Sequence, residues 1–182
     1  MGRERATPGG VGYAAAKLGA DATVAVIAVA NAFGDVLDEH GELLGAPRDD
    51  RGELVRTGRL VREMREPPFV ALRDGANTTL ACVCTDASLD KRGCGIVARI
   101  ASAGIARAVD PAFTPIDGDV VFCIASGSDT PPTPGPEASW QLTVLGALGG
   151  SLTAAAIRDA VRQGADPVPQ SAGAARSSSS PA

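Results

Sequence analysis

The chain has 182 residues, which is enough for one domain with a sizeable core and too few to expect two. Hydrophobic residues make up 45% of it but aromatic residues only 3%, so a core must be built from Ala, Val, Leu and Ile in closely packed layers of helix and sheet. The net charge of −4, without a basic block, argues against nucleic acid as a partner and leaves small molecules or further copies of the chain.

The N-terminus carries no recognisable signal for export or membrane attachment. Met1–Arg5 is charged and no apolar segment follows it, unlike a secretory signal. The longest apolar run, Ala22–Ala30, is too short to span a bilayer. We therefore expect a cytoplasmic protein without membrane association and with reduced cysteines. Cys82 and Cys84 should point to one face of a strand as small hydrophobic residues, and their spacing does not suit zinc or redox chemistry.

The first strong pattern along the chain is that of a buried strand. Gly9–Gly12 precedes this strand and is not followed by Gly-Lys-Ser/Thr, so a phosphate-binding loop is not indicated. Ala22–Ala30 is a continuous apolar run rich in β-branched residues, which is typical of a strand covered on both faces. The strand brings Asn31 to its end. The chain then bends at Gly34 and turns over residues 38–42.

A charged stretch leads from the first strand to the second. Residues 47–74 have only a weak helical pattern, which predicts an irregular surface linker. The loop ends at Asn77, and Thr78 and Thr79 open an apolar strand that runs to Thr85. A threonine at the mouth of a strand, behind a loop that can be cut, is where an N-terminal nucleophile would sit.

A helix and a third strand come next. The apolar spacing predicts a helix from about residue 90 to residue 108, with Ser88 or Asp90 as its N-cap. The turn over residues 115–119 then leads into a buried strand, Val120–Ala125.

The last predicted element is a helical region over residues 139–163. Glycine disfavours helix, so we expect this region to be interrupted or loosened at Gly146, Gly149 and Gly150. Residues 166–182 are rich in Ser, Pro and Ala and have nothing to bury, which predicts a disordered tail. The predicted organisation is one domain, residues 1–165, followed by this tail.

Taken together and in order, these motifs resemble those of the N-terminal-nucleophile hydrolases that include the nylon-oligomer (6-aminohexanoate-oligomer) hydrolases and the DmpA/BapA-type aminopeptidases. The resemblance covers about residues 9–163 and rests on Gly9–Gly12, the strand ending in Asn31, Asn77–Thr79 with Thr85–Ala87, Gly104–Ala108, Thr114–Asp119 with Val121-Phe122, and Gly127. It implies an α+β protein with the layered αββα-like fold of the DmpA/ornithine-acetyltransferase type. Family members also carry a substantial N-terminal half, so the resemblance is to their C-terminal portion and implies a fold incomplete at its N-terminal side.

The resemblance implies a role for each of five residues. The bond between Asn77 and Thr78 would be cut autocatalytically, and Thr78 would become the nucleophile, with its freed amino group as the base. Asn31 would donate its side-chain amide to the oxyanion, which is worth on the order of 3 kcal/mol in acyl transfer. Asp117 and Asp119 would orient the hydroxyl and ammonium groups of the nucleophile.

Without the resemblance, the residues alone do not decide all of these roles. The single histidine, His40, lies in a polar turn beside Glu39, which disfavours Ser-His-Asp and Cys-His mechanisms. An N-terminal nucleophile needs no histidine, because an α-amino group with a pKa of about 7.7–8.0 can accept the hydroxyl proton. Without the resemblance, Asp117-Gly118-Asp119 is read more readily as a solvated turn, and Asn31 as a strand terminator.

The function implied is a self-processing amidohydrolase or aminopeptidase acting on amides of small amino-compounds, namely N-terminal aminoacyl groups or ω-amino acid oligomers. No metal or cofactor is expected, and the partners expected are this substrate and further copies of the chain. One alternative is an inactive remnant or structural subunit, since the family's N-terminal half is not matched and Pro8 stands where the family has a Lys before the Gly-Gly pair. The other is acyl transfer of the ornithine-acetyltransferase kind.

Overall fold

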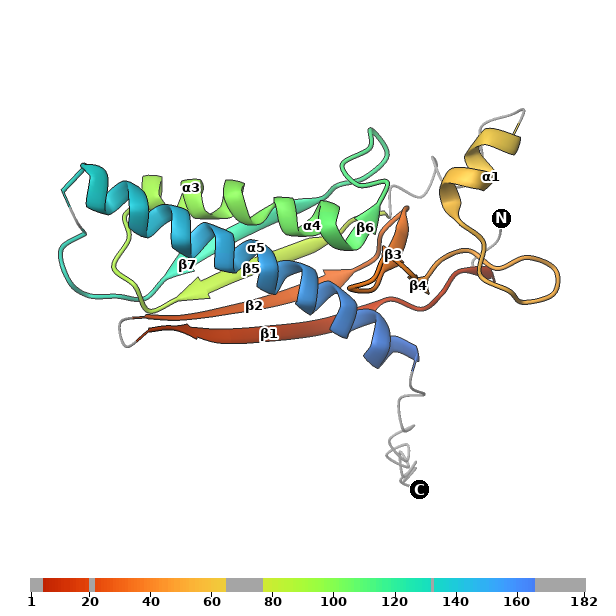
Figure 1. Ribbon diagram of the computed structural model, residues 1–182, viewed down its shortest axis with the longest axis horizontal. Coiled ribbons are helices and arrows are strands. Elements are labelled where there is room, and N and C mark those ends of the chain that lie inside the picture. The colour runs from red at the N-terminus through yellow and green to blue at the C-terminus, as the bar shows by residue number, and fades with distance from the viewer. Residues whose placement is uncertain (1–4, 20–21, 65–76, 132, 166–182) are drawn as a thin grey trace, which may run out of the picture.

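The chain folds into both helices and strands in the computed structural model, which describes residues 5–19, 22–64, 77–131 and 133–165 (Figure 1). In chain order the elements are β1 (Gly10–Leu18), β2 (Ala22–Ala30), β3 (Asp35–Leu37), β4 (Leu43–Gly45), α1 (Thr57–Glu63), β5 (Leu80–Thr85), α3 (Lys91–Ala101), α4 (Ala103–Ala108), β6 (Val109–Asp110), β7 (Val120–Ala125) and α5 (Pro136–Ala165). The predicted α+β class is therefore observed.

Four strands form the main sheet, in the order β1-β2-β5-β7. β1, β2 and β5 are antiparallel neighbours, whereas β7 runs parallel to β5. The parallel pair requires a crossover, and α3 and α4 supply it. A second, three-stranded sheet, β4-β3-β6, lies at one end of the main sheet (Figure 1). The predicted strands Ala22–Ala30 and Val120–Ala125 have the observed bounds, and the strand predicted from Thr79 begins at Leu80.

The edge strand β1 corrects the prediction that Gly9–Gly12 precedes the first strand. β1 starts at Gly10 and pairs with β2 along its whole length, from Gly10 opposite Ala30 to Leu18 opposite Ala22. Its Gly- and Ala-rich sequence has little strand propensity, so tertiary pairing decides its conformation. A Cβ atom at Gly12 would lie 2.2 Å from the backbone nitrogen of Ala160, which shows that glycine lets α5 lie directly on this strand.

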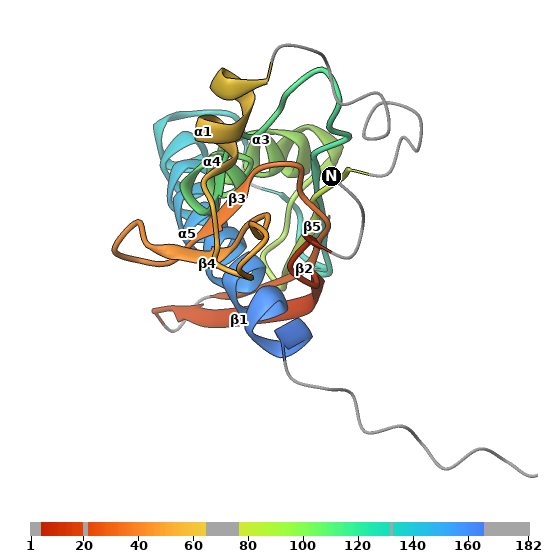
Figure 2. The same ribbon diagram turned by 90° about the vertical axis from the view of Figure 1, so that its right-hand side faces the viewer.

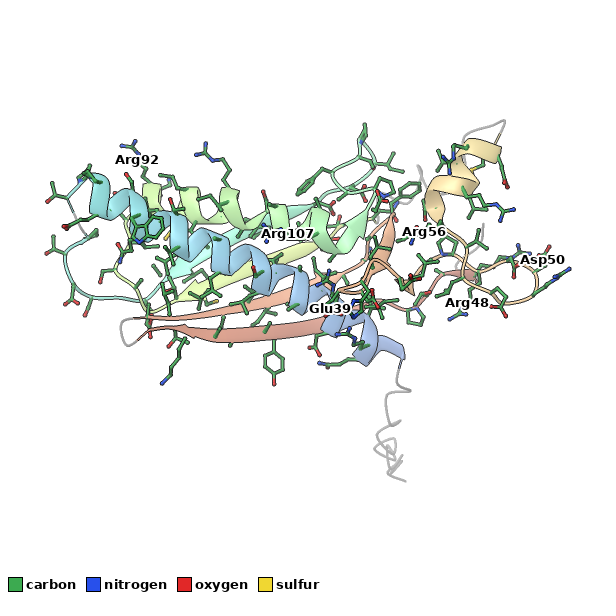
Figure 3. The ribbon with its side chains drawn as sticks, in the orientation of Figure 1. Glu39, Arg48, Asp50, Arg56, Arg92 and Arg107 are labelled. Atoms are coloured by element: carbon green, nitrogen blue, oxygen red, sulfur yellow. The ribbon has the colours of Figure 1, made fainter. Side chains whose placement is uncertain are left out.

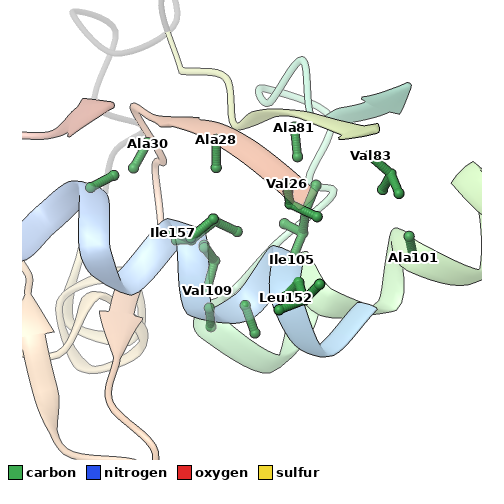
Figure 4. Packing of buried hydrophobic residues seen from close by; sticks show 14 of the residues in the cluster. Val26, Ala28, Ala30, Ala81, Val83, Ala101, Ile105, Val109, Leu152 and Ile157 are labelled. Carbon is green, nitrogen blue, oxygen red and sulfur yellow. The ribbon is translucent and has the colours of Figure 1, made fainter. Parts of the chain in front are cut away.

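Three helices cover one face of the main sheet and form the core with it (Figures 1 and 2). α5 packs on β1 and β2, and α3 lies beside it over β7. Buried side chains from both layers interlock in Figure 4, including Val26, Ala28, Ala81, Val83, Ala101, Ile105, Leu152 and Ile157. Ile157 is completely buried, and burial of a side chain of this kind contributes about 1.5–3 kcal/mol.

The helices differ from the prediction at two points. The predicted helix over residues 90–108 is two helices joined at Ser102, and Asp90 is its N-cap, with a side-chain oxygen 2.7 Å from the Gly93 nitrogen. α5 is continuous, so the expected interruptions at its glycines are absent from the described chain. A Cβ atom at Gly146 would lie 2.7 Å from Ile100 Cβ, which shows that α5 uses this glycine for close contact with α3.

α5 is also long and apolar enough to cross a membrane by length and composition alone. The helix that meets this criterion is Pro136–Gly164, and half of its 18-residue apolar window is buried inside the protein. Its contacts with β1, β2, α3 and α4 are those of a core helix. This feature is therefore weak evidence for a membrane span.

The opposite face of the main sheet is apolar and exposed, which corrects the expectation that Ala22–Ala30 is covered on both faces. Val24, Val26 and Ala28 are completely buried, whereas Ile27, between them, is 53% exposed. The large exposed residues of the four strands share this face: Val11, Tyr13, Ile27, Val29, Leu80, Phe122 and Ile124. We call this surface the open face.

Charged residues lie mainly around the small sheet and α1. Glu39 lies beside the C-terminal part of α5 and accepts a hydrogen bond of 2.9 Å from Arg162 (Figure 3). Asp35 is buried and accepts hydrogen bonds from the backbone and hydroxyl of Thr57; its burial raises the pKa of its carboxyl group. The predicted linker thus contains one short helix, α1, while its last residues, 65–74, and the predicted tail lie outside the described residues.

Candidate functional site

One row of residues crosses all four strands at an end of the main sheet. The register pairs Gly10 with Ala30, Val29 with Leu80, and Leu80 with Val120. Continued toward this end, the same registers align Gly9, Asn31, Thr78 and Gly118. Hydrogen bonds support the alignment, because the Thr78 nitrogen donates to the Asn31 carbonyl at 2.8 Å and Asn77 bridges to Asp117.

This row belongs to the open face, because residues two apart on a strand point the same way. Thr78 and Asn31 are two residues from Leu80 and Val29, both of which are exposed on that face. Glycines stand on either side of the pair, Gly9 next to Asn31 and Gly118 next to Thr78. Thr78 and Asn31 therefore lie next to each other on the open face, and the two residues that flank them in the row carry no side chains.

The peptide bond before Thr78 is held by two hydrogen-bond donors. The Thr78 hydroxyl donates to the Asn77 carbonyl oxygen at 2.7 Å, and the Gly118 backbone nitrogen donates to the same oxygen at 2.9 Å. Thr78 is half-buried, so water can reach it. The nucleophile predicted for self-cleavage thus lies against the carbonyl group it would attack.

Asp119 joins the start of β5 to the turn before β7. One carboxylate oxygen accepts from the Thr79 nitrogen at 2.7 Å, and the other accepts from the Phe113 nitrogen at 2.9 Å. A hydrogen bond to a charged acceptor is among the stronger ones in proteins. Asp119 therefore fixes the residue immediately after Thr78.

Asp117 ties the same turn to the segment after β2. Its carboxylate accepts from the Phe33 nitrogen at 3.3 Å and from the nitrogen and hydroxyl of Thr114. The structure thus brings together Asn31, Thr78 and the two aspartates, as predicted. In the intact chain both carboxylates bind backbone groups around Thr78, so their orientation of its hydroxyl and ammonium groups stays a prediction.

Other predicted features lie away from this row. His40 is exposed in the turn after β3, with its nitrogen bonded to Asp38. Cys82 and Cys84 face the same way as predicted, with their sulfur atoms 4.0 Å apart; burial first, and then the neighbouring Cys84, raises the pKa of Cys82 to about 11. Among the described residues, no three His, Cys, Asp or Glu side chains cluster as metal ligands.

Thr79 carries a buried hydroxyl that has no hydrogen-bond partner within the described part of the chain. An unsatisfied buried polar group costs about 1–3 kcal/mol, and Val has the same shape without this group. We expect Thr79→Val to raise the free energy of unfolding by about 1 kcal/mol in urea denaturation. Thr79→Ala, the matched control, should lower it because it leaves a cavity. A loss of stability in the Val variant would show that the hydroxyl is hydrogen bonded.

Sequence reasoning did not find the backbone part of the site. Gly118 and Thr114 were part of a recognised motif but had no role, and Phe33 and Phe113 were not singled out. Gly118 and Phe33 contribute backbone amides that meet partners far away in the sequence, Asn77 and Asp117. Phe113 and Thr114 bond to Asp119 and Asp117 within the same turn. Backbone groups are the same in every residue, so only the tertiary structure reveals these contacts.

Two solved structures share this fold. A Burkholderia sp. β-aminopeptidase superposes with a TM-score of 0.54 at 23% identity, over 84% of this chain and 41% of its own. An L-aminopeptidase D-Ala-esterase/amidase from Ochrobactrum anthropi, described as a variant of the Ntn hydrolase fold, gives 0.50 at 20% identity, over 84% and 39%. Both confirm the predicted fold class.

Sequence relatives agree with the structural ones. Uncharacterized aminopeptidases of Mycobacterium tuberculosis (strain ATCC 25618 / H37Rv) and Mycobacterium leprae (strain TN) are 35% and 34% identical, over 85% and 84% of this chain. The chain spans about half the length of these curated relatives, 48% and 44%. The pattern of peptidase family S58 matches residues 5–174, nearly the whole chain. The resemblance to DmpA/BapA-type aminopeptidases is thus confirmed, and this chain belongs to peptidase family S58.

Proposed function

We propose that the protein is a self-processing N-terminal-nucleophile amidohydrolase that cuts its own chain between Asn77 and Thr78. The observation that carries the proposal is the 2.7 Å contact between the Thr78 hydroxyl and the Asn77 carbonyl oxygen. A hydroxyl held this close to its own preceding carbonyl is positioned for intramolecular attack, which gains from proximity and orientation. Membership of a peptidase family supports this chemistry.

Self-cleavage would take two steps. In the first, Thr78 Oγ1 bonds to the carbonyl carbon of Asn77, the bond from that carbon to the Thr78 nitrogen breaks, and the hydroxyl proton passes to the nitrogen. The product is an ester with a free amino group. In the second, water attacks the ester carbon, giving a carboxylic acid on Asn77 and restoring the Thr78 hydroxyl. Both oxygens and all protons are then accounted for.

The new amino group would remain where the amide nitrogen lies now. That nitrogen is 2.8 Å from the Asn31 carbonyl oxygen, which can keep accepting from it after cleavage. The amine can then take the proton of the Thr78 hydroxyl when a substrate amide is attacked. Asn31 lies beside Thr78 in the same row, and we propose that the side-chain amide of Asn31 stabilises the oxyanion.

The substrates we propose are amides of small amino-compounds, either N-terminal aminoacyl groups or ω-amino acid oligomers. The aminopeptidase names of the relatives support the first class. The open face beside Thr78 is apolar and gives no cluster of charges for a highly charged substrate. Acyl transfer to ornithine remains the alternative use of the same threonine.

The test is the intact mass of the purified protein, followed by an activity assay. We expect two chains, residues 1–77 and 78–182, the second with Thr78 as its N-terminal residue on sequencing. The processed protein should release amine from an aminoacyl p-nitroanilide or a 6-aminohexanoate dimer at a rate unaffected by added ornithine. Formation of acyl-ornithine would favour the transferase, and a chain that stays whole would favour the inactive remnant.

We also propose that copies of the chain associate through the open face. Four strands about 4.8 Å apart and six to nine residues long present roughly 400–600 Å² of surface. Stable interfaces bury about 800 Å² on each partner, so the open face supplies most of one. Lys17 is the only charged residue among the outward positions of the four strands, so little polar surface must be desolvated.

Ile27→Lys combined with Phe122→Lys should weaken this association. Both side chains are more than half exposed near the middle of the open face, where buried ammonium groups would be costly. Size-exclusion chromatography with light scattering should give an oligomer for the parent chain and a smaller species for the double variant. Val61→Lys, which changes an equally exposed residue on α1, is the control and should leave the oligomer intact. A monomeric parent would contradict the proposal.

A further inference from the structure

We infer that Gly118 is the residue that makes the Asn77–Thr78 bond cleavable, through its backbone N–H and through its missing side chain. This inference rests on the proposed self-cleavage and assigns the first step a specific oxyanion donor. Gly118 lies two residues before β7, forty residues away from Thr78 in the sequence. The register of the parallel strands alone brings the two together.

The carbonyl oxygen of Asn77 already has the Gly118 N–H as a hydrogen-bond donor. When Thr78 Oγ1 attacks, negative charge develops on this oxygen, and a donor already aimed at it stabilises the transition state. The Gly118 nitrogen is 2.9 Å from that oxygen in the intact chain. The other donor to the same oxygen is the attacking hydroxyl, which gives up its proton during the step. The Gly118 N–H therefore stays as a donor when the charge forms.

The space beside the Thr78 hydroxyl is free only because residue 118 has no side chain. A Cβ atom at Gly118 would lie 2.7 Å from Thr78 Oγ1 and 3.6 Å from its Cβ and Cγ2 atoms. Non-bonded carbon and oxygen atoms do not approach to 2.7 Å without repulsion, so any side chain here would push the hydroxyl away from its attack position. A displacement of about 1 Å can cost two orders of magnitude in rate. Only glycine satisfies both requirements.

Gly118→Ala should therefore slow cleavage about a hundredfold or more while the protein still folds. One control is Gly127→Ala, beyond the other end of β7, where the added atom would lie 2.5 Å from Ser88 Oγ and 2.6 Å from backbone atoms of Ala87 and Asp86, so its strain is at least as large but remote from Thr78. A second control is Gly95→Ala on α3, where nothing lies within 4 Å of the added atom. Cleavage is followed by intact mass over time, and folding by circular dichroism. Both controls should cleave at the parental rate.

Hydroxylamine tells the two steps apart. It attacks an ester but not a normal amide at neutral pH, so it should accelerate a variant whose defect is in ester hydrolysis. Our inference places the defect of Gly118→Ala in formation of the ester, and hydroxylamine should therefore not rescue it.

The amide-to-ester change at the Asp117–Gly118 linkage, made by ligating a synthetic segment at Cys94 and Cys123, replaces the N–H with an oxygen and adds no side chain. It should also slow cleavage about a hundredfold.

The outcomes separate this inference from the proposed function. A parent chain that cleaves while Gly118→Ala cleaves equally fast overturns the role of Gly118 and leaves self-processing intact. Equal slowing in Gly127→Ala, or rescue by hydroxylamine, overturns it as well, because the effect would then be general strain or a later step. A folded parent chain that never cleaves overturns the proposed function and this inference with it.

Discussion

Replacing Thr78 by Ala should abolish self-cleavage and leave a single chain of full mass. The change removes the hydroxyl that lies 2.7 Å from the Asn77 carbonyl oxygen, and no intramolecular attack is possible without it. The backbone bond from residue 78 to the Asn31 carbonyl does not depend on the side chain, so the fold should persist. Intact mass after prolonged incubation gives the result directly, and no amine should be released from substrates.

Thr78→Ser is the matched variant. It keeps the hydroxyl and removes only a methyl group, so it should still produce a second chain, now beginning with Ser. Cleavage in the Ala variant at the same bond would mean that an external protease, and not Thr78, cuts this bond. That result would remove the main support for the proposed function.

Asp119→Asn should slow both self-cleavage and turnover by about a hundredfold or more, as the loss of a positioned proton-handling group typically does. The substitution keeps the shape but removes a negative charge next to Thr78. It also turns one acceptor into an NH₂ group facing the Thr79 or Phe113 nitrogen, and leaving that N–H unpaired costs about 1–3 kcal/mol. We therefore expect a measurable loss of stability, beyond the small change expected for a solvated turn. Asp117→Asn should act in the same direction.

The control for both variants is Asp86→Asn. Asp86 also accepts from a strand nitrogen, that of Thr23 at 2.6 Å, but at the opposite end of the sheet. The Asp86→Asn substitution should leave the cleavage rate unchanged. Equal cleavage rates in the parent and in folded Asp119→Asn and Asp117→Asn variants would show that the two aspartates only stabilise the turn and take no part in cleavage. Urea denaturation and the cleavage time course together separate these cases.

The sequence predicted correctly those elements whose signal is local. β2 and β7 are continuous apolar runs, so their bounds followed from pattern and propensity. The start of α3 was predicted from its apolar stripe and from Asp90 as one of two candidate caps, whereas its end at Ala101 was not. β1 and the continuity of α5 could not be predicted in this way. Both depend on glycines that disfavour regular structure by themselves and favour it only where two backbones meet closely, as Gly12 does with Ala160.

The candidate site likewise has a part that the sequence predicted and a part that only the tertiary structure showed. By itself the sequence singled out the candidate side chains, because Thr78 at a strand mouth, Asn31 at a strand end and the Asp117–Asp119 turn are short motifs whose order resembles that of the family. Only the tertiary structure decided that the Gly118 N–H lies on the Asn77 carbonyl oxygen, that both carboxylates hold backbone amides, and that the sheet keeps an open face. The physical reason is that strand register joins groups forty or more residues apart, and backbone amides carry no mark in the sequence.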